Sequence, residues 1–158
     1  MLYYKKISSS LGEITLRSDG QFLTGLWFAN DKHYGDKDIQ DAQTAELPVF
    51  ALAEKWLAEY FAGCKPKVKV PLQFTGTDFQ KCVWKILQNI PYGCLVTYGD
   101  IACEIAAQRG LARMSAQAVG GAVGRNPLCI IIPCHRVIGA DGSLTGYGGG
   151  MWRKVRLL

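Results

Sequence analysis

The sequence lacks features that would each define a class of protein. No run of about 18 apolar residues occurs, so no membrane-spanning helix is predicted. Residues 1–12 are polar and lack the apolar core of a secretory signal, so we expect a cytoplasmic protein. Two histidines and no Cys-x-x-Cys pair argue against a bound metal and against a disulfide framework. The six cysteines, expected to be reduced, are Cys64, Cys82, Cys94, Cys103, Cys129 and Cys134.

The charges are distributed unevenly along the 158 residues. Residues 1–64 hold six basic and nine acidic side chains, a net charge of −3, whereas residues 65–158 hold twelve and four, a net charge of +8. A basic second half favours an anionic partner, and nucleic acid is the first candidate. A solvated basic surface is the ordinary alternative, because charge alone is a non-specific signal.

The first half of the chain has the pattern of a small sheet followed by a helix. Short apolar runs around residues 2–4, 14–16 and 22–28, with turn residues between them, predict antiparallel strands. Residues 29–43 are polar and rich in aspartate, which predicts a loop, and apolar residues at helical spacing predict a helix over 46–62. Residues 65–71 are a plausible linker. We therefore expect an N-terminal α/β domain over residues 1–70.

The second half, residues 71–158, has the pattern of a winged helix-turn-helix domain. Thr77 or Asp78 can cap a helix that reaches Ile90, Thr97 can cap one from Tyr98 to about Gln108, and Ser115 can cap one that reaches Gly124. A strand and a glycine-rich wing over residues 139–150 follow. The fold class predicted for the whole chain is therefore α/β (α+β).

The third of these helices consists almost entirely of small residues, Ser-Ala-Gln-Ala-Val-Gly-Gly-Ala-Val-Gly over 115–124. Each internal glycine costs about 1 kcal/mol of helix stability relative to alanine. Two explanations are open: the helix packs very tightly inside the protein, or another surface, such as a nucleic-acid groove, approaches it closely. In the second case Arg125 could reach a phosphate.

The segment Ile130-Ile131-Ile132-Pro133-Cys134-His135-Arg136-Val137 carries the clearest chemistry. Three β-branched residues before a proline predict a buried strand that ends at Cys134. Imidazole and guanidinium groups favour the thiolate, which is the nucleophilic form of cysteine. In an extended backbone the side chains of Cys134 and His135 would point to opposite faces, so contact would need a bend or a bridging water. The ordinary alternative is a buried, inert cysteine.

Several motifs in the same order resemble those of the O6-alkylguanine-DNA alkyltransferases, also called methylated-DNA–protein-cysteine methyltransferases. They are Pro-Cys-His-Arg-Val at 133–137, Ile-Pro-Tyr-Gly at 90–93, Thr-Tyr-Gly-Asp-Ile-Ala at 97–102, Ala-Val-Gly-Gly-Ala at 118–122 and Asn-Pro at 126–127. The resemblance is close over about residues 74–158 and covers residues 1–70 in outline. It implies repair of double-stranded DNA by one irreversible transfer of an alkyl group from guanine O6, or from thymine O4, to Cys134. It also implies a monomer without a cofactor.

The resemblance further implies roles for individual residues. Cys134 would be the nucleophile, His135 its general base through a water, Tyr98 a proton or hydrogen-bond donor to the base, and Asn126 an orienting group. Without the resemblance, Tyr98 reads as a packing residue. The implied DNA- or base-binding residues are Thr97, Gln117, Ala118, Gly120, Arg125, Arg136, Val137, Tyr147 and Gly148. Arg136 has a structural alternative, as a bridge between backbone segments.

Two features depart from the family pattern. Gln117 stands where the family has an arginine that fills the space of the flipped nucleotide, so support for flipping is reduced unless a group such as Arg113 assists. The glutamate that orients the family's histidine would fall beyond Leu158, and a chain that ends there is expected to have a slower thiol. Two other functions agree less well with the sequence. A non-catalytic DNA-binding module would lack Cys134, and a cysteine hydrolase would need a distant histidine, for which only His33 is available.

Overall fold

The computed structural model describes residues 2–29, 31, 33–139 and 157. It divides into two compact units. The N-terminal unit comprises Met1–Asn30 and Tyr34–Phe74, and the C-terminal unit comprises Asp31–His33 and Thr75–Leu158. Within the described part of the chain, no helix has the length and apolar character needed to cross a membrane.

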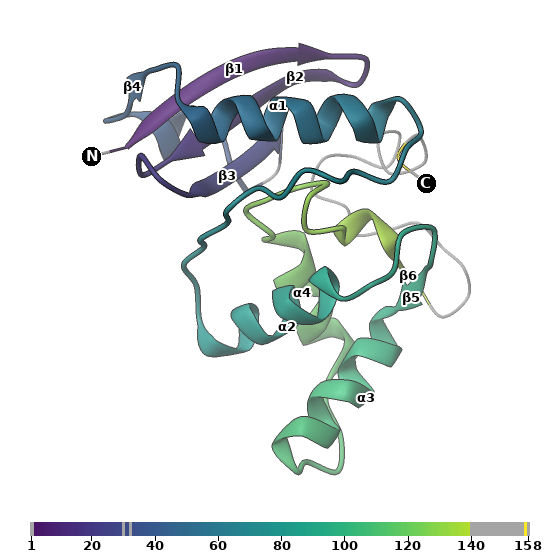
Figure 1. The fold of residues 1–158 in the computed structure, drawn as a ribbon. Coiled ribbons are helices and arrows are strands. Elements are labelled where there is room, and N and C mark those ends of the chain that lie inside the picture. Colours follow the sequence, from purple (N-terminus) through teal and green to yellow (C-terminus); the bar gives the residue numbers. More distant parts are fainter. Residues whose placement is uncertain (1, 30, 32, 140–156, 158) are drawn as a thin grey trace. The chain divides into compact units, whose positions relative to one another are not determined.

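The N-terminal unit is built on a four-stranded sheet with the order β3-β2-β1-β4 (Figure 1). Strands β1 (Tyr3–Ser9), β2 (Gly12–Ser18) and β3 (Leu23–Phe28) are antiparallel, which confirms the prediction. The short strand β4 (Gln43–Thr44) adds parallel to β1. In this register Ile14 lies opposite both Ile7 and Phe28, so apolar side chains of neighbouring strands meet on one face.

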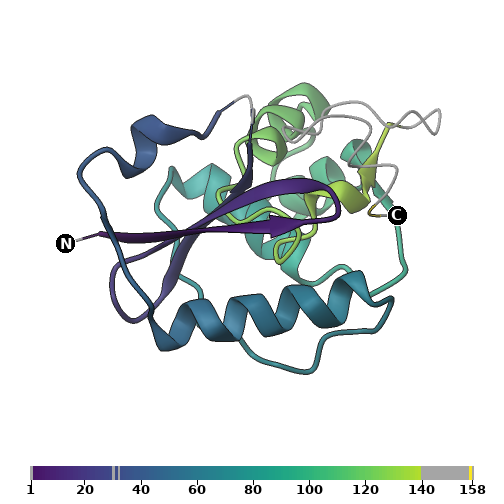
Figure 2. The ribbon, with the colours of Figure 1, turned by 90° about the horizontal axis from the view of Figure 1, so that it is seen from above.

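A single helix, α1 (Pro48–Phe61), packs on this sheet, within the predicted range 46–62. Figures 1 and 2 show it running alongside the strands. Proline at the first turn favours initiation because it has no N–H that needs a partner, and Gly63, with φ +84°, follows the helix end. Phe50 and Ala53 are fully buried at the centre of the face that contacts β2 and β3.

The loop predicted over residues 29–43 contains regular structure, so that prediction was wrong in part. It holds a 3₁₀ helix, η1 (Asp36–Ile39), and it leads directly into β4. The Asp38 carboxylate accepts the backbone N–H of Gly35 at 2.8 Å, and Ile39 is buried. The aspartates that suggested a loop therefore satisfy local backbone donors, while one apolar side chain anchors the turn to the core.

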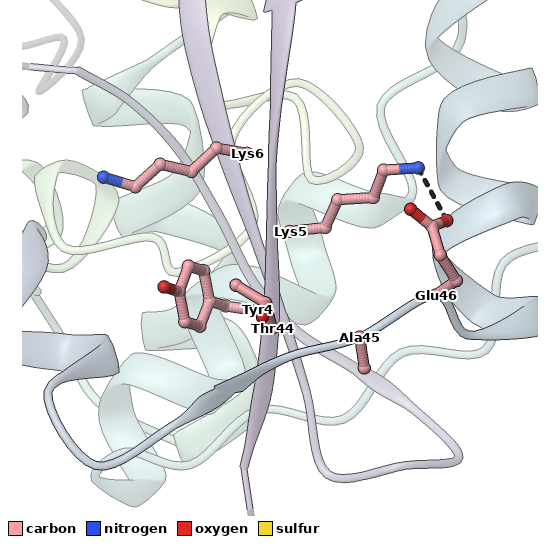
Figure 3. A pocket seen from close by; sticks show the side chains of 6 residues that line it. All are labelled: Tyr4, Lys5, Lys6, Thr44, Ala45 and Glu46. Atoms are coloured by element: carbon pink, nitrogen blue, oxygen red, sulfur yellow. Dashed lines mark hydrogen bonds and ion pairs between the residues drawn. The ribbon is translucent and has the colours of Figure 1, made fainter.

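A groove of about 640 Å³ lies where β4 diverges from β1 (Figure 3). Its described lining residues are Tyr4, Lys5, Lys6, Thr44, Ala45 and Glu46, and these include no cysteine, serine or histidine. Lys5 Nζ lies 2.8 Å from the Glu46 carboxylate and Lys6 Nζ lies 3.2 Å from that of Asp36, so acids compensate both lysines. The described lining therefore offers no thiol or imidazole and no lysine without a nearby carboxylate.

Up to Gly139, where its continuous description ends, the C-terminal unit contains three α-helices, α2 (Asp78–Gln88), α3 (Tyr98–Arg109) and α4 (Ala116–Gly124). The predicted caps are confirmed: the hydroxyls of Thr77, Thr97 and Ser115 each accept a backbone N–H three residues later. Helix α4 packs against both α2 and α3 (Figure 1). A two-stranded parallel sheet joins β5 (Val96–Thr97) to β6 (Val137–Ile138).

The strand predicted over Ile130–Ile132 does not form. These residues lie in a turn that is closed by a hydrogen bond from the N–H of Ile132 to the carbonyl of Leu128 at 2.9 Å. Ile130 and Ile132 are nonetheless buried, with 1% and 0% of their surface exposed. The apolar run therefore signalled burial correctly, but burial does not require an extended backbone. The predicted wing lies, except for Gly139, outside the described residues.

Candidate active site

Cys134 begins a second short 3₁₀ helix, η2 (Cys134–Arg136), and is 4% exposed. Pro133, with φ −79° and ψ 64°, forms an inverse γ-turn, in which the N–H of Cys134 donates to the carbonyl of Ile132 at 2.7 Å. The expectation of an extended backbone at Cys134 was wrong, so its side chain and that of His135 are not on opposite faces of a strand. The chain bends sharply just before the thiol.

Asn126 is buried and its side chain holds the segment that leads to Cys134. Its Nδ2 donates to the carbonyl of Ile132 at 2.7 Å, and its Oδ1 accepts the N–H of Leu128 at 3.0 Å. The Ile132 carbonyl therefore receives two donors, one from Asn126 and one from the backbone of Cys134. These bonds connect the end of α4 to the nucleophile through a single oxygen atom.

Tyr98 is the first residue of α3 and is partly buried. Burial raises the pKa of its phenol, and the negative charge of the nearby Cys134 thiolate raises it further. Both effects favour the protonated phenol, which can donate a hydrogen bond at neutral pH. A Cβ atom placed on Gly120 of α4 would lie 3.9 Å from two carbons of the Tyr98 ring. Tyr98 therefore connects α4 with the surroundings of the thiol.

Helix α4 has two contrasting faces. Val119, Ala122 and Val123 are buried, and Trp84 Nε1 donates to the carbonyl of Ala122 at 2.9 Å. On the other face Gln117, Ala118 and Gly121 are exposed, and a Cβ on Gly121 would meet nothing within 4 Å. Tight internal packing therefore does not explain the glycine at 121. The small exposed face is compatible with close approach of another molecule.

Four other predicted site residues occupy different kinds of position. Thr97 caps α3, and Arg125 is exposed at the end of α4. Arg136 is 9% exposed, donates to the carbonyl of Ile90 at 3.3 Å and lies over the Tyr92 ring, which fits the structural alternative. Val137 is fully buried in β6, so it presents no surface to DNA in this conformation. Tyr147 and Gly148 lie outside the described residues.

His135 follows Cys134 in η2 and is fully buried, and its Nδ1 atom has no contact with solvent. Sequence reasoning missed two features of this unit, the backbone turn at Ile130 and the position of the Tyr98 ring beside Gly120 of α4. The alanine- and glycine-rich pattern of α4 hinted at the second feature, but a run of isoleucines gives no signal for the first. Among the described residues no group of three potential metal ligands comes together.

The two units correspond to two domains of one known family. Residues 2–74 match the ribonuclease-like domain of 6-O-methylguanine DNA methyltransferase, and residues 78–158 match the DNA binding domain of the same family. A methylated-DNA–protein-cysteine methyltransferase of Mycobacterium tuberculosis is 44% identical over 158 residues, which are 100% of this chain and 91% of that protein. A protein of the same name from Haemophilus influenzae is 39% identical, covering 99% of this chain and 84% of its own length.

Solved structures agree with these sequence matches. A crystal structure of Mycobacterium tuberculosis OGT in complex with DNA superposes with a TM-score of 0.85 at 44% identity, covering 99% of this chain and 90% of that one. An O6-methylguanine DNA methyltransferase from Methanococcus jannaschii gives a TM-score of 0.64 at 27% identity, covering 98% and 90%. Both the sequence and the fold thus place this chain in the 6-O-methylguanine DNA methyltransferase family.

Proposed function

We propose that this chain repairs DNA by transferring the alkyl group of an O6-alkylguanine to Cys134, once per molecule. The bond between the alkyl carbon and guanine O6 breaks while a bond to Cys134 Sγ forms. The electron pair stays on the guanine, which takes up a proton and leaves unmodified. The observation that carries this proposal is the Cys134 thiol at the start of η2, fixed through the Ile132 carbonyl by Asn126, in a chain of this family.

Each catalytic role follows from the chemistry of transfer. Guanine oxygen is a poor leaving group unless its developing charge is quenched, and a protonated phenol is a suitable donor. The raised pKa of Tyr98 keeps that donor protonated next to a thiolate. His135 is the neighbour of Cys134 in η2 and serves as the base that takes the thiol proton. The thioether product is stable, so the chain acts stoichiometrically and needs no dissociable cofactor.

The burial of Cys134 restricts how the substrate can approach. With 4% of its surface exposed, the thiol cannot reach a base that stays stacked in a duplex. A flipped nucleotide can bring its O6 substituent into a protein pocket, as in other enzymes that modify bases. The role fits a monomer that binds double-stranded DNA, with residues 75–158 carrying both the binding surface and the thiol.

The exposed face of α4 is the surface that we assign to the DNA groove. The small residues Gly121 and Ala118 allow DNA to approach the backbone of α4 closely. Arg125 at the helix end supplies positive charge for a phosphate. Gln117 lies in the first turn and fills the space that the flipped nucleotide leaves, without adding charge. A DNA complex of a relative with 44% identity and the same fold supports DNA binding by this chain.

The decisive experiment is mass spectrometry of the chain after incubation with a duplex that contains O6-methylguanine. We expect the Cys134 peptide to gain the mass of one methyl group and the Cys134→Ser variant to gain none. Cys129→Ser is the matched control, since Cys129 is equally buried, at 3% exposed, and should leave labelling of Cys134 intact. DNA binding without any mass gain would instead indicate a non-catalytic module, and methylation of another cysteine would refute the assigned nucleophile.

A further inference from the structure

The turn before Cys134 contains an unusual backbone conformation at Ile130. Its φ is +69°, and it is the one non-glycine residue with positive φ in the described part of the chain. The N–H of Ile131 donates to the carbonyl of Cys129 at 2.8 Å, so Ile130 is the centre of a γ-turn of the rare, strained type. A β-branched residue disfavours this region, so the surrounding structure must hold it there. The Ile130 side chain is 1% exposed, and its burial keeps the backbone in this conformation.

Hydrogen bonds connect this turn to the nucleophile. The N–H of Ile132 donates to the carbonyl of Leu128 at 2.9 Å and thereby closes a loop around the γ-turn. The carbonyl of Ile132 then accepts both Asn126 Nδ2 and the N–H of Cys134, each at 2.7 Å. If Ile130 relaxed to a negative φ, the peptide groups on either side would rotate and the Ile132 carbonyl would move. The N–H of Cys134 would lose its acceptor in the same movement.

We infer that Ile130 is a positioning residue for the Cys134 thiol: its buried side chain holds a strained γ-turn that places the Ile132 carbonyl and, through it, the backbone of Cys134. The inference rests on the proposed alkyl transfer and adds to it a residue that does not touch the substrate. A buried isoleucine without this role would contribute only to packing. The positioning role and the packing role predict different rates of methyl transfer when residue 130 is glycine and when it is alanine.

The test compares Ile130→Gly with Ile130→Ala. Both variants remove nearly the same buried surface, but glycine adopts a positive φ freely whereas alanine does not. We expect Ile130→Gly to transfer methyl about tenfold faster than Ile130→Ala, the population ratio that the left-handed penalty for a Cβ implies. The matched control is the same pair at Ile132, which is also fully buried but does not have positive φ. There the alanine variant should be at least as fast as the glycine variant.

A second readout needs no DNA. The rate at which iodoacetamide labels Cys134 is measured across pH, by mass spectrometry of the Cys134 peptide. The same order, Ile130→Gly above Ile130→Ala, supports the inference, and equal rates or the reverse order overturn it. If the wild-type chain labels at Cys134 but receives no methyl group, the proposed function fails while the labelling order still decides the role of Ile130.

A milder pair of variants covers the case in which both truncated variants unfold. Ile130→Leu lacks the β-branch that opposes a positive φ, whereas Ile130→Val keeps the branch and more of the original shape. The inference predicts faster labelling and transfer for Ile130→Leu. A packing role predicts that Ile130→Val is at least as fast, and that result would overturn the inference.

Discussion

Replacing Asn126 with alanine tests how the loop before Cys134 is held. The substitution deletes two hydrogen bonds of about 1 kcal/mol each and leaves the N–H of Leu128 buried without its acceptor. In this variant the Ile132 carbonyl still accepts the N–H of Cys134, so the carbonyl is not left without a hydrogen bond. We therefore expect a loss of about 3 kcal/mol in the free energy of unfolding. A domain of ordinary stability, about 5–15 kcal/mol, would remain folded at 25 °C.

Urea unfolding measures this loss, and single-turnover methyl transfer at 25 °C measures its consequence. Because misplacing a reacting group by about 1 Å can cost about 100-fold in rate, we expect a fall of that order in the folded variant. The matched control is Asn89→Ala at an exposed position after α2, for which a change within about 0.5 kcal/mol is expected. An Asn126→Ala variant with wild-type stability and wild-type transfer would refute the argument.

The Asn126→Asp variant tests the two hydrogen bonds of Asn126 separately. The variant keeps an oxygen that can accept the N–H of Leu128, but it replaces the Nδ2 donor with a second oxygen that faces the Ile132 carbonyl. We expect it to be at least as unstable as Asn126→Ala at neutral pH, and to recover in part at acid pH, where a protonated carboxyl can donate. No difference between the two pH values would show that the bond to Ile132 contributes little.

The remaining predictions concern the phenol and the exposed face of α4. Tyr98→Phe should slow transfer about 100-fold without weakening DNA binding. Because the pKa of Tyr98 is raised, the wild-type donor should be lost only at a higher pH than for an ordinary tyrosine, and a rate that falls at neutral pH would contradict this. Gly121→Ala should raise the free energy of unfolding by about 0.5–1 kcal/mol, because the added Cβ meets open space; a loss of stability would show that this Cβ clashes with a neighbouring atom. Gly121→Leu should weaken DNA binding in a titration. Gln117→Arg should tighten DNA binding and steepen the dependence of log affinity on log salt by about 1, whereas an unchanged slope would place residue 117 away from the backbone phosphates.

Local sequence patterns predicted most of the elements because their causes are local. The hydroxyls of Thr77, Thr97 and Ser115 cap their helices through bonds that span three residues, so the starts of α2, α3 and α4 could be read directly. Apolar spacing likewise predicted α1 and the three antiparallel strands. Cys134 and the residues around it stand out because Pro-Cys-His-Arg-Val at 133–137 is a short, specific motif.

Local patterns did not predict the backbone conformation of the loop that leads to Cys134. Three isoleucines in a row favour a strand by local preference, yet Ile130 adopts a positive φ within a γ-turn. The side chain of Asn126 and the burial of Ile130 impose that conformation, and both depend on packing that a local pattern does not contain. The sequence likewise contained no signal that Arg136 and Val137, both implied as DNA-binding by the resemblance, are buried.

The sequence alone therefore predicted the candidate nucleophile, Cys134, and determined where the helices begin, since both follow from residue types and short spacings. Only the tertiary structure decided how the thiol is presented, which face of α4 is open and which motif residues are buried. These properties arise from hydrogen bonds and contacts between residues far apart in the chain. Their energies can exceed a local backbone preference of about 1–3 kcal/mol.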